Sequence, residues 1–197
     1  MKQYYEQRAA EYDEWYEGTR LFASRDRPGW VEDRQALVGA VAALPEASTL
    51  DVACGTGYLT QHLHGSVTGL DQSESMVEIA SARIPAGRFV VSDALPLPFA
   101  DGEFDRVFTG HFYGHLEEPA RVRFLDEVRR VARELVVADT AVQPDHEAVE
   151  WQERVLNDGS RHEVYKRYFT GEGLAEELGG GEVLHAGPWF VVVRVSL

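Results

Sequence analysis

Hydrophobic and polar positions follow two alternating patterns through the middle of the chain. Short continuous apolar runs, typical of strands buried on both faces of a sheet, alternate with segments whose apolar residues recur at helical spacing. This order indicates an α/β fold, in which helices cover both faces of a mostly parallel sheet. The predicted strands are 48–53, 66–71, 88–92, 104–110 and 134–140, and the predicted helices between them are 58–64, 73–84 and 119–132.

Two further helices are predicted before this region. Residues 2–17 should form one helix, because apolar and aromatic residues recur there at helical spacing. A second helix should begin near Pro28, since proline is favoured in a first helical turn. The buried face of that second helix is expected to carry Trp30, Leu37, Val41 and Leu44.

The C-terminal part of the chain has a different character. Residues 141–169 are polar with weak periodicity, and we expect a crossover or lid over the strand tips. A helix at 171–178 should end at three consecutive glycines. Two strands, near 182–186 and 189–196, should then form an antiparallel hairpin at the sheet edge, which completes seven strands.

Length and composition limit the class of protein. The 197 residues suffice for one domain with a real core and are short for two. We therefore predict a single domain over 1–197, in which 1–45 lies over a ligand site, 46–140 binds the ligand, and 141–197 supplies the lid and last strands.

The charge of the chain indicates what kind of partner it has. The formal net charge is −14, whereas binding to nucleic-acid phosphates is expected to require a basic surface, and anionic membranes repel an acidic one. We therefore expect a small-molecule partner, neither nucleic acid nor membrane, and a monomer or homodimer.

Features of the chain that bear on its compartment agree with one another. Cys54 is the single cysteine, which excludes an internal disulfide and fits a reducing compartment. The first residues are charged and aromatic, unlike a signal peptide, and no apolar run is long enough to cross a bilayer. We predict a cytoplasmic protein.

The most informative pattern follows the strand at 48–53. Gly55 and Gly57 come directly after it, and a turn without Cβ atoms allows positive φ and close approach of a ligand. Asp71 ends the next apolar run, where a carboxylate can accept hydrogen bonds from both hydroxyls of a ribose. Together they predict a nucleoside-cofactor site.

A dinucleotide cofactor would favour a third glycine, yet Thr60 stands at that position. The chain instead resembles the class I S-adenosylmethionine-dependent methyltransferases, in four ordered motifs. These are Asp51–Gly57, Gly69–Met76, Ser92–Phe99 and Phe104–Asp105, with a looser likeness over Tyr4–Asp13. The resemblance implies a Rossmann-like fold, S-adenosylmethionine as cofactor, and methyl transfer to an oxygen or nitrogen of a small metabolite.

The resemblance also implies roles for particular residues. Asp51 would organise the turn and the methionine end of the cofactor, Asp71 the ribose, and Asp93 the adenine amino group. An N-terminal tyrosine and arginine would reach the methionine carboxylate. The residues expected to bind the cofactor are Tyr5, Arg8, Asp51, Ala53, Gly55, Gly57, Asp71, Gln72, Met76, Ser92, Asp93, Ala94, Gly110 and His111.

Several of these residues also have plainer interpretations. Asp71 could cap the following helix, although Ser73 can do that instead, and Met76 could belong to the core. Tyr12 and Tyr16 are expected mainly to pack. Cys54 is expected only to fill the tight turn.

His111 is the candidate catalytic residue, because it follows the fourth strand at the edge where open α/β sheets bind ligands. It could remove a proton from the acceptor or only shape the pocket, and His115 is expected to shape it. No metal is expected, since this pair has no evident third ligand. The basic run 161–169 could meet an anionic substrate or be a solvated charge run.

Two other functions remain open from the sequence. One is a dinucleotide-dependent oxidoreductase, and the other is a methyltransferase-like protein that binds the cofactor without catalysis.

Overall fold

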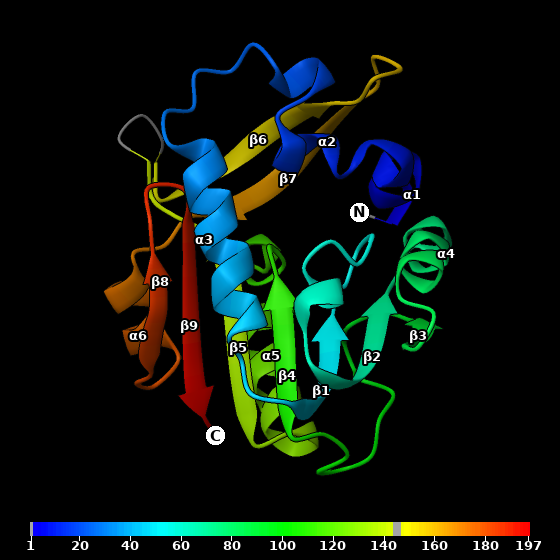
Figure 1. The fold of residues 1–197 in the computed structure, drawn as a ribbon, viewed down its shortest axis with the longest axis vertical. Coiled ribbons are helices and arrows are strands. Elements are labelled where there is room, and N and C mark those ends of the chain that lie inside the picture. The colour runs from blue at the N-terminus through cyan, green and yellow to red at the C-terminus, as the bar shows by residue number, and fades with distance from the viewer. Residues whose placement is uncertain (1, 144–146) are drawn as a thin grey trace.

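The computed structural model describes residues 2–143 and 147–197, and this part of the chain contains a seven-stranded mixed sheet (Figure 1). The strand order is β3-β2-β1-β4-β5-β9-β8, with β9 antiparallel to both of its neighbours and the other pairs parallel. The predicted fold class is confirmed. The strands are β1 (Ala47–Val52), β2 (Gly65–Asp71), β3 (Arg88–Val91), β4 (Arg106–Gly110), β5 (Glu134–Thr140), β8 (Glu182–Ala186) and β9 (Phe190–Ser196).

Helices lie on both faces of this sheet. In Figure 1, α3 (Trp30–Ala42) crosses one face beside β8 and β9, and α5 (Glu118–Val131) lies behind the sheet. Two further helices, α4 (Glu74–Arg83) and α6 (Gly171–Glu177), flank it near β2 and β9. None of the helices in the described residues is long and apolar enough to cross a membrane.

The two faces of the sheet carry separate hydrophobic clusters. Along β5, Leu135 and Val137 join the cluster that includes residues of α5, whereas Val136 and Ala138 join the cluster that includes residues of α3. Alternate residues of a strand point to opposite faces, so a continuous apolar run is buried on both. This packing explains why the central strands could be predicted from their apolar runs.

Two of the predicted helices are wrong. The glycine turn is followed by a single 3₁₀ turn, η3 (Thr60–His62), rather than a helix over 58–64. Residues 2–17 form no continuous helix. The chain bends over the sheet edge in short pieces, which are α1 (Lys2–Arg8), η1 (Ala9–Glu11) and α2 (Glu14–Glu17), followed by η2 (Arg20–Phe22).

The segment predicted as a crossover or lid is mainly an antiparallel hairpin, β6 (Val149–Val155) and β7 (Arg161–Arg167). It lies over the carboxyl ends of the parallel strands, near α1 and α2 (Figure 1). Residues 144–146 of that segment lie outside the described residues. The alternation was hidden because β6 is inverted. Its apolar side chains, such as Trp151, are exposed, whereas Glu150, Gln152 and Arg154 are half-buried.

Candidate functional site

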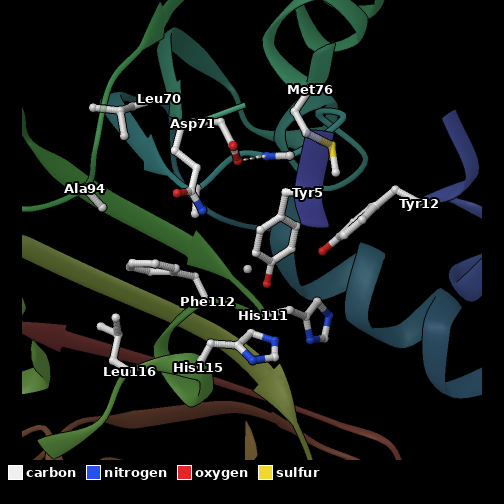
Figure 2. Close-up of a pocket in the computed structure, with 14 residues that line it drawn as sticks. Tyr5, Tyr12, Leu70, Asp71, Met76, Ala94, His111, Phe112, His115 and Leu116 are labelled. Carbon is white, nitrogen blue, oxygen red and sulfur yellow. Dashed lines mark hydrogen bonds between the residues drawn. The ribbon is translucent and has the colours of Figure 1, made fainter. Parts of the chain in front are cut away.

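The main cavity of the candidate site has a volume of about 230 Å³ and opens at the carboxyl ends of β1, β2 and β4. Parallel α/β sheets bind ligands at this edge. Figure 2 shows the side chains that surround it, with Asp71 and Met76 on one side and the two histidines on the other. The lining residues are Tyr5, Tyr12, Ala53, Gly55, Leu70, Asp71, Gln72, Met76, Ala94, Gly110, His111, Phe112, His115 and Leu116.

The glycine turn has the backbone conformation that the sequence predicts. Gly55 and Gly57 have φ of +54° and +76°, a region that side chains with a Cβ rarely adopt. Gly55 lines the cavity. Gly57 faces away from it, since an added Cβ would lie 3.3 Å from the Cβ of Ala80 in α4. The second glycine therefore serves the packing of the turn against α4.

Asp71 connects the turn to the start of α4. Its Oδ2 accepts a hydrogen bond from the amide of Gly55 at 3.0 Å, and its Oδ1 accepts one from the amide of Ser73 at 2.9 Å. The Ser73 hydroxyl itself caps α4 by accepting from the Met76 amide. Asp71 therefore does not cap the helix. The backbone amide of Gln72 also faces this carboxylate. A carboxylate has about four acceptor positions, so Asp71 keeps acceptor capacity for a ribose hydroxyl.

Asp51 is deeply buried beneath the turn. Its Oδ2 accepts a hydrogen bond from the Thr60 hydroxyl at 2.6 Å, while its Oδ1 has no partner within the described residues. Burial raises the pKa of Asp51 to about 8, against the Thr60 hydrogen bond, and the charge of Asp71 raises it further. An unpartnered buried carboxylate oxygen fits the ammonium group of an amino-acid moiety. Burial likewise raises the pKa of the Cys54 thiol, which makes this residue a poor nucleophile.

His111 occupies an unusual backbone position at the end of β4. Its φ is +56°, its side chain is buried, and its Nε2 has no partner in the described part of the chain. Its Nδ1 lies 3.4 Å from the Thr140 hydroxyl and 3.9 Å from a carboxylate oxygen of Asp139. Burial lowers the pKa of His111 to about 4, although Asp139 opposes this. The imidazole is therefore neutral and weakly basic near pH 7.

His115 is neutral for a similar reason. Its Nδ1 donates to the carbonyl of Tyr165 in β7 at 2.7 Å, and burial lowers its pKa to about 3. Between the two histidines, the buried Asp139 pairs with Lys166 at 2.6 Å. No group of three histidine, cysteine, aspartate or glutamate side chains among the described residues could hold a metal ion.

The N-terminal segment is attached to the site at several points. The Glu6 carboxylate accepts from the Ser73 hydroxyl and from the amides of Glu74 and Ser75 at the start of α4. Asp13 accepts from the Thr56 hydroxyl at 2.6 Å and pairs with Arg83 at 2.5 Å. These contacts hold α1 and α2 over the cavity.

Most residues predicted to bind the cofactor line this cavity. Those that do are Tyr5, Ala53, Gly55, Asp71, Gln72, Met76, Ala94, Gly110 and His111. The others lie elsewhere: Asp51 beside a neighbouring cavity under the turn, Arg8 in a second cavity toward β6 and β7, and Gly57 against α4. Ser92 is half-buried and Asp93 exposed, and neither lines the described cavity.

Some lining residues were missed by the sequence reasoning. Tyr12 was expected to pack, but the break after Arg8 turns its ring toward Gly55, whose Cβ position lies 3.7 Å away. Phe112 and Leu116 follow β4 and could have been found from their place after Gly110, whereas His115, which was expected to shape the pocket, does line it. Leu70 could have been found because it directly precedes Asp71.

Comparisons with known proteins agree with this geometry. A family model described as a methyltransferase domain matches residues 49–134. A demethylmenaquinone methyltransferase of Thermotoga maritima is 36% identical over 105 residues, covering 51% of this chain and 45% of that protein. A phthiotriol/phenolphthiotriol dimycocerosates methyltransferase of Mycobacterium ulcerans is 39% identical over 116 residues, covering 52% and 40%. The chain thus spans about half the length of the curated relatives it matches.

Two solved structures are similar over nearly the whole chain. A structure titled "DhpI-SAH complex structure" has a TM-score of 0.76 and 26% identity, covering 98% of this chain and 92% of that one. A second, titled "DhpI-SAM-HEP complex", has a TM-score of 0.77 and 25% identity, covering 98% and 94%. The methyltransferase domain matched over 49–134, the sheet and these two structures make the chain similar to the class I S-adenosylmethionine-dependent methyltransferases, and S-adenosylmethionine is the cofactor that this similarity indicates.

Proposed function

We propose that the protein transfers the methyl group of S-adenosylmethionine to an oxygen or nitrogen atom of a small metabolite. The observation that carries this proposal is the position of Asp71, which is hydrogen-bonded to the glycine turn in the wall of the main cavity. The half-satisfied carboxylate of Asp51 supports it, because a cationic amino group would complete its hydrogen bonds. A cytoplasmic location, a monomeric or dimeric state, and the division of 1–197 into three parts remain predictions.

The main work of such a site is alignment. When bound, S-adenosylmethionine supplies a methyl group already activated by its sulfonium, so proximity and orientation provide most of the rate. Asp71 would hold the ribose, Asp51 the amino group, and Tyr5 would cover the site from α1. In Figure 2 the Tyr5 hydroxyl points into the space beside His111 and His115, which marks the side where an acceptor would enter.

The basicity of His111 bears on the acceptor. A group with a pKa of about 4 is a weak base near pH 7, so it contributes little to removing a proton from a hydroxyl. We infer that the acceptor atom arrives with a free lone pair, as a neutral amine or an anionic oxygen, so that no proton has to be removed before the transfer. A proton left on an ammonium product would then pass to solvent. His111 then acts by positioning, through the hydrogen-bond capacity of its free Nε2.

Calorimetry and a transfer assay test the proposal. S-adenosylhomocysteine should bind and NADH should not. Asp71→Ala should weaken S-adenosylhomocysteine about ten- to hundredfold, since charge-assisted hydrogen bonds are lost. The exposed Asp126→Ala provides the matched control, because it removes one carboxylate far from the cavity. Preferential NADH binding would refute the proposal, as would unchanged affinity in Asp71→Ala.

A transfer assay with a labelled methyl group distinguishes catalysis from cofactor binding alone. Methyl-labelled S-adenosylmethionine should yield labelled small metabolites in a mixed metabolite extract, with the wild type and Asp126→Ala but not with Asp71→Ala at limiting cofactor. Tight cofactor binding without any labelled product would instead favour the non-catalytic alternative.

A further inference from the structure

A second, narrower cavity of about 50 Å³ lies between the main cavity and the β6–β7 hairpin. Arg8 comes to it from α1, Arg154 from β6 and Lys166 from β7. Its volume holds roughly four water-sized atoms, enough for one small polar group. The residues that line both cavities are Tyr5, Tyr12, His111 and His115.

The positive charge in this second cavity is only partly compensated. Lys166 is paired with Asp139. Arg8 donates to the neutral hydroxyl of Tyr4, and Arg154 has no hydrogen bond or ion pair among the described residues. Arg8 also lies over the rings of Tyr4 and Tyr12, but no carboxylate among the described residues pairs with either arginine, in a chain whose net charge is −14. Such a local reversal of sign attracts anions.

The cations also repel one another. Arg25 lies near this group, and its pKa is lowered first by burial and then by the charges of Arg154 and Arg8. Burial lowers the pKa of Lys166 as well; Asp139 opposes this, and Arg154 lowers it further. A bound anion would relieve this repulsion.

The hairpin itself is built to present polar groups inward. On β6, Gln152 and Arg154 are half-buried while Trp151 is 62% exposed. A hairpin that only covered the site would be expected to turn its apolar face inward, because that burial is favourable. The inverted arrangement places the guanidinium of Arg154 at the second cavity instead.

We propose that the methyl acceptor carries an oxyanionic group, of the carboxylate or phosphate type, which Arg154 and Arg8 bind in this second cavity. This inference rests on the proposed function. Because the walls are shared, an acceptor anchored there extends toward His111 and the cofactor. Of the residues in the basic run 161–169, only Lys166 lines the second cavity. Arg161 and Arg167 pair instead with Glu153 and Glu177, respectively.

The test uses the protein saturated with S-adenosylhomocysteine, into which inorganic phosphate or acetate is titrated by calorimetry at low salt. At least one of the two should bind. Arg154→Gln should weaken that binding about ten- to hundredfold, and Arg154→Lys should retain part of it. Arg161→Gln is the matched control: it removes the same charge from the same hairpin, at an exposed position paired with Glu153, and should change binding less than about twofold.

Three results would overturn the inference while leaving the proposed function intact. One is that neither anion binds to the complex with S-adenosylhomocysteine. Another is that Arg154→Gln weakens S-adenosylhomocysteine as strongly as the anion, which would assign the cavity to the carboxylate of the cofactor. The third is an equal loss in Arg161→Gln, which would indicate unspecific attraction. Failure of S-adenosylhomocysteine to bind the wild type would instead refute the proposed function.

Discussion

Replacement of Asp51 by asparagine should change both the stability of the ligand-free protein and the proton balance of cofactor binding. The pKa of this carboxyl rises from 3.8 to about 8 because it is buried. Since the folded state holds the proton more tightly than the unfolded state, stability is greatest below pH 4 for this group and is lost as the pH rises toward 8. At about 1.4 kcal/mol per pH unit, the loss has an upper limit of about 6 kcal/mol.

Cofactor binding should shift Asp51 from the protonated form to the ionised form. At pH 7 the ligand-free Asp51 is mostly protonated, whereas an ammonium group beside its free Oδ1 favours the carboxylate. Binding of S-adenosylhomocysteine should therefore release up to one proton. His111 and His115 stay neutral at this pH and release none.

The assay is calorimetry at pH 7 in two buffers with different heats of ionisation. The wild type and the exposed control Asp126→Asn should give buffer-dependent heats, and Asp51→Asn should not. In chemical denaturation, the free energy of unfolding of Asp51→Asn should also decline less between pH 4 and pH 8 than that of the wild type. A wild-type binding heat that is the same in both buffers would contradict proton release from Asp51, as would equal proton release in Asp51→Asn.

Three further predictions follow from the same geometry. Gly55→Val should reduce S-adenosylhomocysteine affinity at least tenfold by calorimetry while circular dichroism stays near that of the wild type, because φ there is +54°; full affinity would contradict this. His111→Gln should keep most transfer activity, and the wild-type rate should show no rise through pH 6–7; such a rise, lost in the variant, would restore a base role. Lys166→Met should destabilise the fold by about 3–5 kcal/mol in denaturant titrations, since it leaves Asp139 buried without its cation, and a loss under 1 kcal/mol would show that the pair is not buried in solution.

The sequence predicts the sheet well where each strand is buried on both faces. A strand such as β5, whose residues fill both hydrophobic clusters, must be apolar throughout, and its bounds of 134–140 agree with the prediction. The end of each such strand then locates Asp71 and Gly110 at one edge, which is why most of the residues that line the cavity could be predicted.

The covering segments were harder to predict because their contacts are polar and distant in sequence. The helical spacing of residues 2–17 does not reveal that Glu6 binds the start of α4 or that Asp13 pairs with Arg83. Likewise, β6 turns polar residues inward over a polar cavity. A strand that packs on a hydrophobic core would turn its apolar residues inward, so the pattern in β6 is the opposite of the expected one. The low pKa of His111 depends on burial beneath Trp15 and Phe190, which the motif does not encode.

A crystal structure with S-adenosylhomocysteine tests the central claim most directly. We expect the cofactor in the main cavity, with both ribose hydroxyls within about 3 Å of the Asp71 carboxylate and the amino group beside Asp51. The second cavity, with Arg154, should remain free of any part of the cofactor. A ribose placed away from Asp71 would contradict the account of the cofactor site, and a cofactor carboxylate bound to Arg154 would contradict the assignment of the acceptor.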